Sequence, residues 1–238
     1  MTAVDVLAVI HGERVRAGVF GDVVEERGHR LEEWSLAWAT PLPRPLDSYG
    51  AVLVFGGAMH ADQDDRHPWL REENAFLQRL LHQHIPVLGV CLGAQLLAQA
   101  AGAPVFRADE PEVGWFDVEL TDEARQDVVF SRLPRRFDAF QWHYYSHGLP
   151  AGAVELARSE RCTQAFRLGA NAWGIQFHAE VTREQVEGWI DRPDPDDEGR
   201  IPVRLREQTA ERIERWNGLG RELCGGFLEA AERVALAA

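Results

Sequence analysis

The chain has 238 residues, enough for one complete hydrophobic core, and its 45% hydrophobic and 26% charged residues are ordinary for a globular protein. Its formal net charge of −13 disfavours nucleic acid or an acidic membrane surface as a partner, because a polyanion is repelled at long range. No apolar run approaches the roughly 18 to 20 residues that cross a bilayer, and the N-terminus lacks the segments of a signal peptide. We therefore expect a cytoplasmic protein without nucleic-acid or membrane partners.

Three cysteines, Cys91, Cys162 and Cys224, occur without disulfide-framework or metal-type spacing. An odd number of unpaired cysteines fits a reducing compartment. Cys162 and Cys224 have no sequence setting that suggests chemistry, so we interpret both as structural. Cys91 differs from them in its surroundings.

The first half of the chain alternates predicted strands and helices. Short, nearly continuous apolar runs predict strands buried on both faces, and apolar residues at helical spacing predict the helices that connect them. The strands are expected at 4–10, 31–36, 51–55 and 85–90, and the helices at 14–27, 68–81 and 91–101. This alternation is typical of an α/β, flavodoxin-like, doubly wound, mostly parallel sheet with helices on both faces.

The second half changes to short extended segments, some of which should pair antiparallel as a small extension of the sheet. They are expected at 104–107, 113–120, 137–143, 153–158, 163–167 and 172–177. A short helix at 182–190 precedes a charged, proline-broken loop at 191–197 and a helical tail. Apolar residues of the tail fall on one helix face, which predicts that it docks on the sheet: Ile213, Trp216, Leu223 and Phe227. We expect one domain over 1–190, with 191–238 as a helical extension packed on it.

Gly89-Val90-Cys91-Leu92-Gly93 lies between a predicted strand and a predicted helix. Glycines on both sides allow the sharp turn that presents a nucleophile. The N-terminus of the following helix favours a thiolate, and the Leu92 N–H can donate to a developing oxyanion. Most unpaired cysteines are simply small buried residues, but this setting favours a nucleophile.

A thiol that attacks an amide needs a base, and the base needs a partner that orients it. Gly174-Ile175-Gln176-Phe177-His178-Ala179-Glu180 offers both at the end of a predicted strand. Residues two apart in an extended segment point to the same side, so His178 and Glu180 can be neighbours. Alone, a His-x-Glu pair is weak evidence, because nine histidines occur in the chain.

Together, these residues resemble the class I, or triad, glutamine amidotransferases. The family signatures G-x-C-x-G-x-Q and G-x-Q-F-H-x-E match residues 89–95 and 174–180, and Gly56-Gly57 matches the glycine pair after the preceding strand. The resemblance covers roughly residues 4 to 190 and is greatest to stand-alone proteins similar to the glutaminase domain of GMP synthase.

The resemblance implies a role for each matching residue. Cys91 would be the nucleophile, His178 the general base and acid, and Glu180 the group that orients His178. The N–H groups of Gly57 and Leu92 would form the oxyanion hole. Residues Gln95, His143 and Tyr145 would line the substrate site. The substrate would be glutamine, hydrolysed through a γ-glutamyl thioester, and any synthase that uses the ammonia would be a separate subunit.

Two departures bear on the substrate. Ala179 stands where most relatives have proline, which loosens the turn before Glu180. Tyr144 and Tyr145 stand where relatives often have Gly-Asp, so an aromatic hydroxyl replaces a carboxylate that would bind an amino group. Two alternatives therefore stay open: a stand-alone γ-glutamyl peptide hydrolase with the same triad, and a catalytically silent binding or regulatory subunit.

Cofactors and metals are not expected. The pairs His143 with His147 and His82 with His84 lack the three or four convergent ligands of a zinc site at motif spacing. Gly56-Gly57 matches neither dinucleotide nor P-loop spacing, so we expect no nucleotide-activating site on this chain.

Overall fold

The computed structural model describes residues 3–193, 195–197 and 199–237. Asp194 of the predicted loop lies outside the described residues. So do residues 1–2 of the predicted domain, and residues 198 and 238 of the predicted extension. Within the described residues the strands form one nine-stranded sheet in the order β2-β1-β3-β4-β9-β8-β7-β5-β6. No helix in these ranges is long and apolar enough to span a bilayer.

The first five strands in this order are parallel, and all but the edge strand β2 are almost completely buried. They are β2 (Arg30–Trp34), β1 (Asp5–Val9), β3 (Ala51–Val54), β4 (Val87–Val90) and β9 (Ala172–Ile175). Their order confirms the flavodoxin-like sheet predicted from the sequence. β9 ends two residues earlier than predicted. The carboxyl ends of these strands share one edge, where side chains from distant segments can meet.

The remaining strands pair antiparallel and form a larger extension than predicted. They are β5 (Val105–Leu120), β6 (Arg136–His147), β7 (Val154–Arg158) and β8 (Thr163–Leu168). The separate segments predicted at 104–107 and 113–120 are one continuous strand. An irregularity in its pairing with β6 between Arg107 and Glu112 explains why the sequence pattern looked interrupted.

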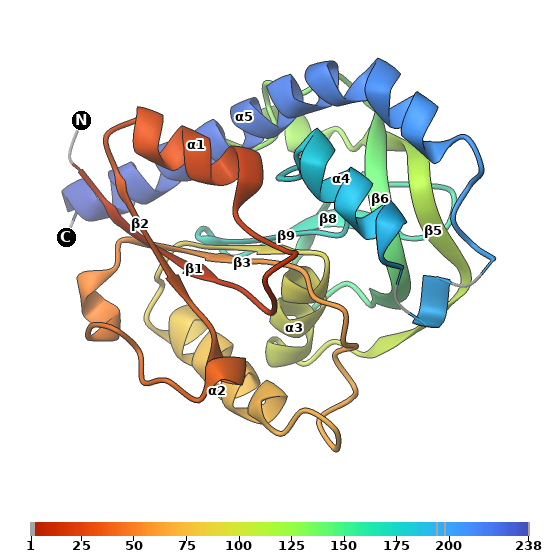
Figure 1. Ribbon diagram of the computed structural model, residues 1–238. Coiled ribbons are helices and arrows are strands. Elements are labelled where there is room, and N and C mark those ends of the chain that lie inside the picture. The colour runs from red at the N-terminus through yellow and green to blue at the C-terminus, as the bar shows by residue number, and fades with distance from the viewer. Residues whose placement is uncertain (1–2, 194, 198, 238) are drawn as a thin grey trace.

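Helices cover both faces of the sheet, as predicted (Figure 1). One face carries α1 (Gly18–Glu26), α4 (Arg183–Asp191) and α5 (Leu205–Ala237), and the other carries α2 (Trp69–His82) and α3 (Leu92–Ala100). The first helix starts later than predicted because the residues before Gly18 form turns, and Gly18 itself has φ 47°. Short 3-10 turns occupy Leu36–Trp38, Leu46–Ser48, Glu123–Gln126 and Pro195–Asp197.

Helix α5 packs along the sheet through the predicted apolar face. Ile213, Trp216, Leu223 and Phe227 are buried in the same core as Trp173 of β9. The packing of this long helix can therefore hold the segment that follows β9.

Candidate active site

Cys91 lies at the junction between β4 and α3 in a strained backbone conformation. Its φ of 53° and ψ of −108° fall outside the regions that non-glycine residues usually adopt. The neighbouring glycines are required by close backbone approach: a Cβ at Gly89 would lie 2.5 Å from the Gly93 carbonyl oxygen, and one at Gly93 would lie 2.1 Å from the Val54 carbonyl oxygen. The sequence therefore builds the sharp turn that a nucleophile elbow needs.

His178 and Glu180 meet at the same edge of the sheet. His178 Nδ1 lies 2.8 Å from Glu180 Oε1, and both side chains are buried. The ring also approaches Cys91, since a Cβ at Gly56 would lie 3.0 Å from His178 Cε1 and 3.6 Å from Cys91 Cβ. Burial alone would lower the pKa of His178, but the charge of Glu180 and the charge and hydrogen bond of Cys91 raise this pKa to about 10.

The His178–Glu180 pair does not arise from strand alternation. β9 ends at Ile175, and residues 176–180 follow it as an irregular segment with bends on both sides of His178. Helix α5 fixes these bends: Trp216 Nε1 donates to the His178 carbonyl at 2.8 Å, and Asn217 Nδ2 donates to the Val181 carbonyl at 2.7 Å. These bonds hold the backbone on both sides of Ala179, the residue at which the sequence departs from the family motif.

Gly57 and Leu92, whose N–H groups are the predicted oxyanion donors, lie beside Cys91 at the same cavity. A Cβ at Gly57 would lie 3.0 Å from Leu92 Cδ2. No hydrogen bond from either N–H to a protein acceptor is found among the described residues. Free N–H groups at a helix start and beside a thiol are suited to receive an oxyanion.

His11 and Glu73 form a buried pair beside these groups that sequence reasoning missed. His11 Nε2 lies 2.9 Å from both Glu73 carboxylate oxygens, and His11 Nδ1 lies 3.0 Å from the Gly56 carbonyl oxygen. Burial would lower the pKa of His11, but the charge and hydrogen bond of Glu73 raise it. The only sequence signal was a histidine directly after the first buried strand, at the edge where the catalytic candidates gather.

The cavity around Cys91 has a volume of about 480 Å³. Gln95, His143 and Tyr145, predicted from the family resemblance to contact substrate, all line it. Gln95 Nε2 donates to the Tyr145 carbonyl at 2.9 Å and to Gln176 Oε1 at 3.2 Å, so it also ties α3 to the sheet. The Tyr145 ring stacks on His60, with centroids 4.1 Å apart.

Three described residues that follow α4 line one side of the cavity: Arg192, Asp196 and Asp197. Asp197 accepts hydrogen bonds from Trp142 Nε1 at 2.8 Å and from the Tyr144 hydroxyl. Burial and the charge of Asp197 raise the pKa of Tyr144. Tyr144, one of the two tyrosines that depart from the family pattern, is therefore engaged with the protein rather than free for substrate.

A second Cys-His-Glu cluster consists of Glu112 from β5, His143 from β6 and Cys162, which directly precedes β8. His143 Nε2 is 3.0 Å from Glu112 Oε2, and Cys162 Sγ is 3.6 Å from the same oxygen. His143 Nδ1 lies 3.0 Å from the Tyr145 carbonyl oxygen. Burial and the charge of Glu112 raise the pKa of the Cys162 thiol to about 12.

This second cluster does not have the order of a catalytic triad. In a triad the imidazole bridges the thiol and the carboxylate, whereas here the carboxylate lies between thiol and imidazole. Gln164 Nε2 also donates to Glu112 Oε2 at 2.7 Å. Both His143 nitrogens have protein partners, the Glu112 carboxylate and the Tyr145 carbonyl. His143 therefore lines the cavity as a residue that supports the Tyr145 backbone.

Comparison with known proteins identifies the family. The sequence model of the class I glutamine amidotransferase family matches residues 24–188. The chain belongs to this family. The glutamine amidotransferase-like protein YfeJ of Salmonella typhimurium is 32% identical over 193 residues, which cover 76% of this chain and 78% of YfeJ.

Two further proteins are similar to this amidotransferase-family chain. The crystal structure of a glutamine amidotransferase from Thermotoga maritima has a TM-score of 0.86 and 31% identity, and the match covers 96% of this chain and 100% of that one. One subunit of the glutamine-hydrolysing GMP synthase of Thermococcus kodakarensis is 34% identical over 115 residues, 47% of this chain and 60% of that relative. The family and fold predicted from the sequence motifs are confirmed.

Proposed function

We propose that this protein hydrolyses the side-chain amide of glutamine with Cys91 as nucleophile, His178 as general base and acid, and Glu180 as the residue that orients His178. The observation that carries the proposal is the convergence of the Cys91 and His178 side chains on Gly56, with Glu180 Oε1 2.8 Å from the far ring nitrogen. This geometry supports an imidazole that bridges thiol and carboxylate, which is the arrangement that the chemistry requires.

The reaction begins when the Cys91 thiolate attacks the γ-carboxamide carbon. The carbonyl oxygen becomes an oxyanion, which accepts hydrogen bonds from the N–H groups of Gly57 and Leu92. His178 donates a proton to the leaving ammonia, and the γ-glutamyl thioester remains on Cys91. Water, deprotonated by His178, then hydrolyses the thioester and releases glutamate.

The name of one relative supports a proposal for the ammonia acceptor. This relative is named as one subunit of a glutamine-hydrolysing GMP synthase, an enzyme that is therefore divided between chains. We propose that the acceptor for this chain is likewise a separate synthase subunit.

The cavity also favours a second candidate, a γ-glutamyl peptide or conjugate as substrate. At about 480 Å³ the cavity has the size of sites for drug-sized ligands, and Trp142, Tyr145 and Trp189 give it aromatic walls. Tyr145 cannot provide the carboxylate that would bind the amino group of free glutamine at this position. A larger substituent on the amide nitrogen could then occupy the aromatic part of the cavity.

A substrate panel separates these candidates. Wild-type and Cys91→Ala protein are incubated with glutamine and with γ-glutamyl peptides, and ammonia and glutamate are measured by mass spectrometry and enzymatic assay. Ammonia from glutamine supports the first candidate, and glutamate plus free amine from the peptides supports the second. If neither is cleaved and no electrophilic glutamine analogue attaches to Cys91, the chain is a silent binding or regulatory subunit.

A further inference from the structure

His11 contacts the backbone that precedes the expected oxyanion donor. His11 Nδ1 lies 3.0 Å from the carbonyl oxygen of Gly56, the residue before Gly57. The His11 side chain is 1% exposed and Glu73 is fully buried, so water does not compete for either group. The His11 ring stacks on Trp69 with centroids 5.5 Å apart, which fixes its plane.

The partners of His11 determine its protonation. A backbone carbonyl and an ionised carboxylate can only accept hydrogen bonds, so both ring nitrogens donate when Glu73 carries its negative charge. Only the imidazolium form has two N–H groups. A cationic His11 opposite an anionic Glu73 also makes the pair neutral as a whole, which is the form in which buried charges are tolerated.

The Gly56 carbonyl and the Gly57 N–H belong to one peptide group. No cis peptide bond occurs in the described residues, so these two groups point in opposite directions from the same plane. A hydrogen bond that holds the carbonyl therefore also fixes the direction of the N–H. A charged donor on the carbonyl polarises the peptide and strengthens the N–H as a donor.

We propose that the His11–Glu73 pair is a positioning device that locks and polarises the Gly56–Gly57 peptide so that the Gly57 N–H points at the oxyanion. This inference rests on the proposed amide hydrolysis at Cys91. Glycines at 56 and 57 would otherwise allow this peptide to rotate, because they restrict the backbone less than other residues do. His11 does not touch the reacting atoms and acts only through the peptide.

Two matched double variants isolate the donor. His11→Leu/Glu73→Gln and His11→Asn/Glu73→Gln both remove the buried charges together, and leucine and asparagine have the same branched side-chain shape. The asparagine side-chain nitrogen can replace His11 Nδ1 as the donor to the Gly56 carbonyl. We expect the leucine variant to lose about 10- to 100-fold in kcat with KM changed less than threefold, below the roughly 100- to 1,000-fold cost of deleting a whole oxyanion donor. The asparagine variant should recover most of this loss.

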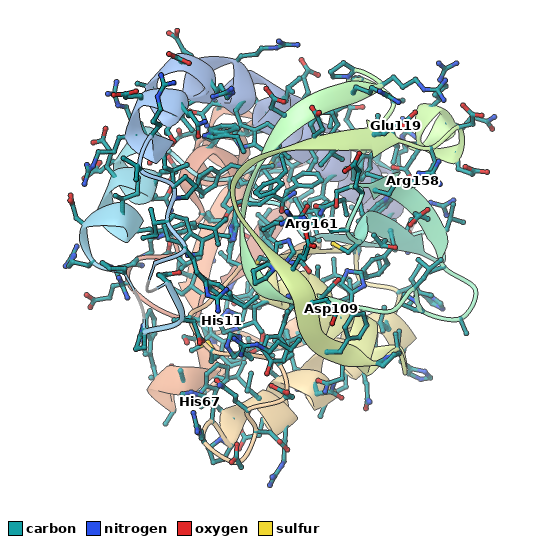
Figure 2. The ribbon with its side chains drawn as sticks, turned by 90° about the vertical axis from the view of Figure 1, so that its right-hand side faces the viewer. His11, His67, Asp109, Glu119, Arg158 and Arg161 are labelled. Atoms are coloured by element: carbon teal, nitrogen blue, oxygen red, sulfur yellow. The ribbon has the colours of Figure 1, made fainter. Side chains whose placement is uncertain are left out.

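Alkylation of Cys91 by iodoacetamide distinguishes positioning from general disruption. Displacement of iodide forms no oxyanion, so both double variants should be alkylated at rates within about twofold of wild type if only the oxyanion hole is affected. His67→Leu is the control, because His67 also packs on Trp69, with centroids 5.8 Å apart, but does not line the cavity. Figure 2 labels both histidines, and His11 lies farther inside the molecule than His67.

An NMR measurement tests the same inference without turnover. In wild-type protein at pH 7.5, the ¹⁵N signals of His11 should show both ring nitrogens protonated. A neutral His11 at this pH, or equal kcat for the leucine and asparagine variants, overturns the inference. Wild-type protein that cleaves no glutamine or γ-glutamyl compound refutes the proposed function instead, and the NMR result still decides the state of the pair.

Discussion

His178 Nδ1 and Glu180 Oε1 lie 2.8 Å apart in a buried setting, and the second oxygen of Glu180 has no hydrogen-bond partner among the described residues. A carboxylate in this position costs desolvation, which the imidazolium form of His178 offsets. The protonation of His178 therefore depends on the Glu180 carboxylate.

Glu180→Gln should lower the pKa of His178, because the amide removes a charge that raises it. Since this pKa is raised in the folded protein, the imidazolium persists to about pH 10 in wild type and is lost at lower pH in the variant. The alkaline limb of kcat/KM should shift to lower pH, and kcat should fall by up to about 10⁴-fold, the loss when the carboxylate of a serine triad becomes an amide. Glu187→Gln, on an exposed pair with Arg183, should leave both unchanged. An unshifted alkaline limb would contradict the assignment of Glu180.

Helix α5 should be required for the geometry of the His178–Glu180 segment. A Cβ at Gly220 would lie 2.1 Å from the Ala179 carbonyl oxygen, so Gly220→Ala must displace the helix or the bend. We expect a loss of about 1 to 3 kcal/mol in the free energy of unfolding and a lower kcat.

Gly218→Ala is the matched control on the same helix, because nothing lies within 4 Å of its added Cβ. This variant should gain up to about 1 kcal/mol from helix propensity and keep full activity. Urea unfolding measures the free energy of unfolding, and ammonia release measures activity. Equal behaviour of the two alanine variants would show that α5 does not constrain the segment.

His143→Gln should destabilise the protein in a pH-dependent way. Burial would raise the pKa of Glu112, but the hydrogen bond and charge of His143 lower it below its ordinary value. A lowered carboxyl pKa contributes stability that is present above about pH 4.5 and is lost as the pH falls through the folded-state value. The difference in unfolding free energy between wild type and variant should be about 3 kcal/mol at pH 7 and shrink toward pH 3. A difference independent of pH would mean that the variant acts through packing alone.

The sequence predicted the parts of the fold that depend on local pattern. Continuous apolar runs identified the buried parallel strands, and glycines around Cys91 identified the turn that presents it. Predictions that assumed regular geometry were less accurate. His178 and Glu180 meet through bends held by Trp216 and not through strand alternation.

Contacts between distant segments could not be predicted in this way. Glu73 looked like one more helix residue, yet it is buried against His11, 62 positions away. Glu112 and Cys162 likewise meet His143 only because β5, β6 and β8 belong to one sheet. Buried polar pairs of this kind depend on tertiary packing, and no spacing rule in a single sequence encodes them.

The most direct test is to treat the protein with an electrophilic glutamine analogue and to map the modified cysteine by peptide mass spectrometry. The proposed function predicts one adduct, on Cys91, which glutamine protects and which His178→Ala slows. Cys162, whose thiol pKa is raised to about 12, should stay unmodified. An adduct on Cys162, or no adduct on Cys91, would contradict the proposed catalytic centre.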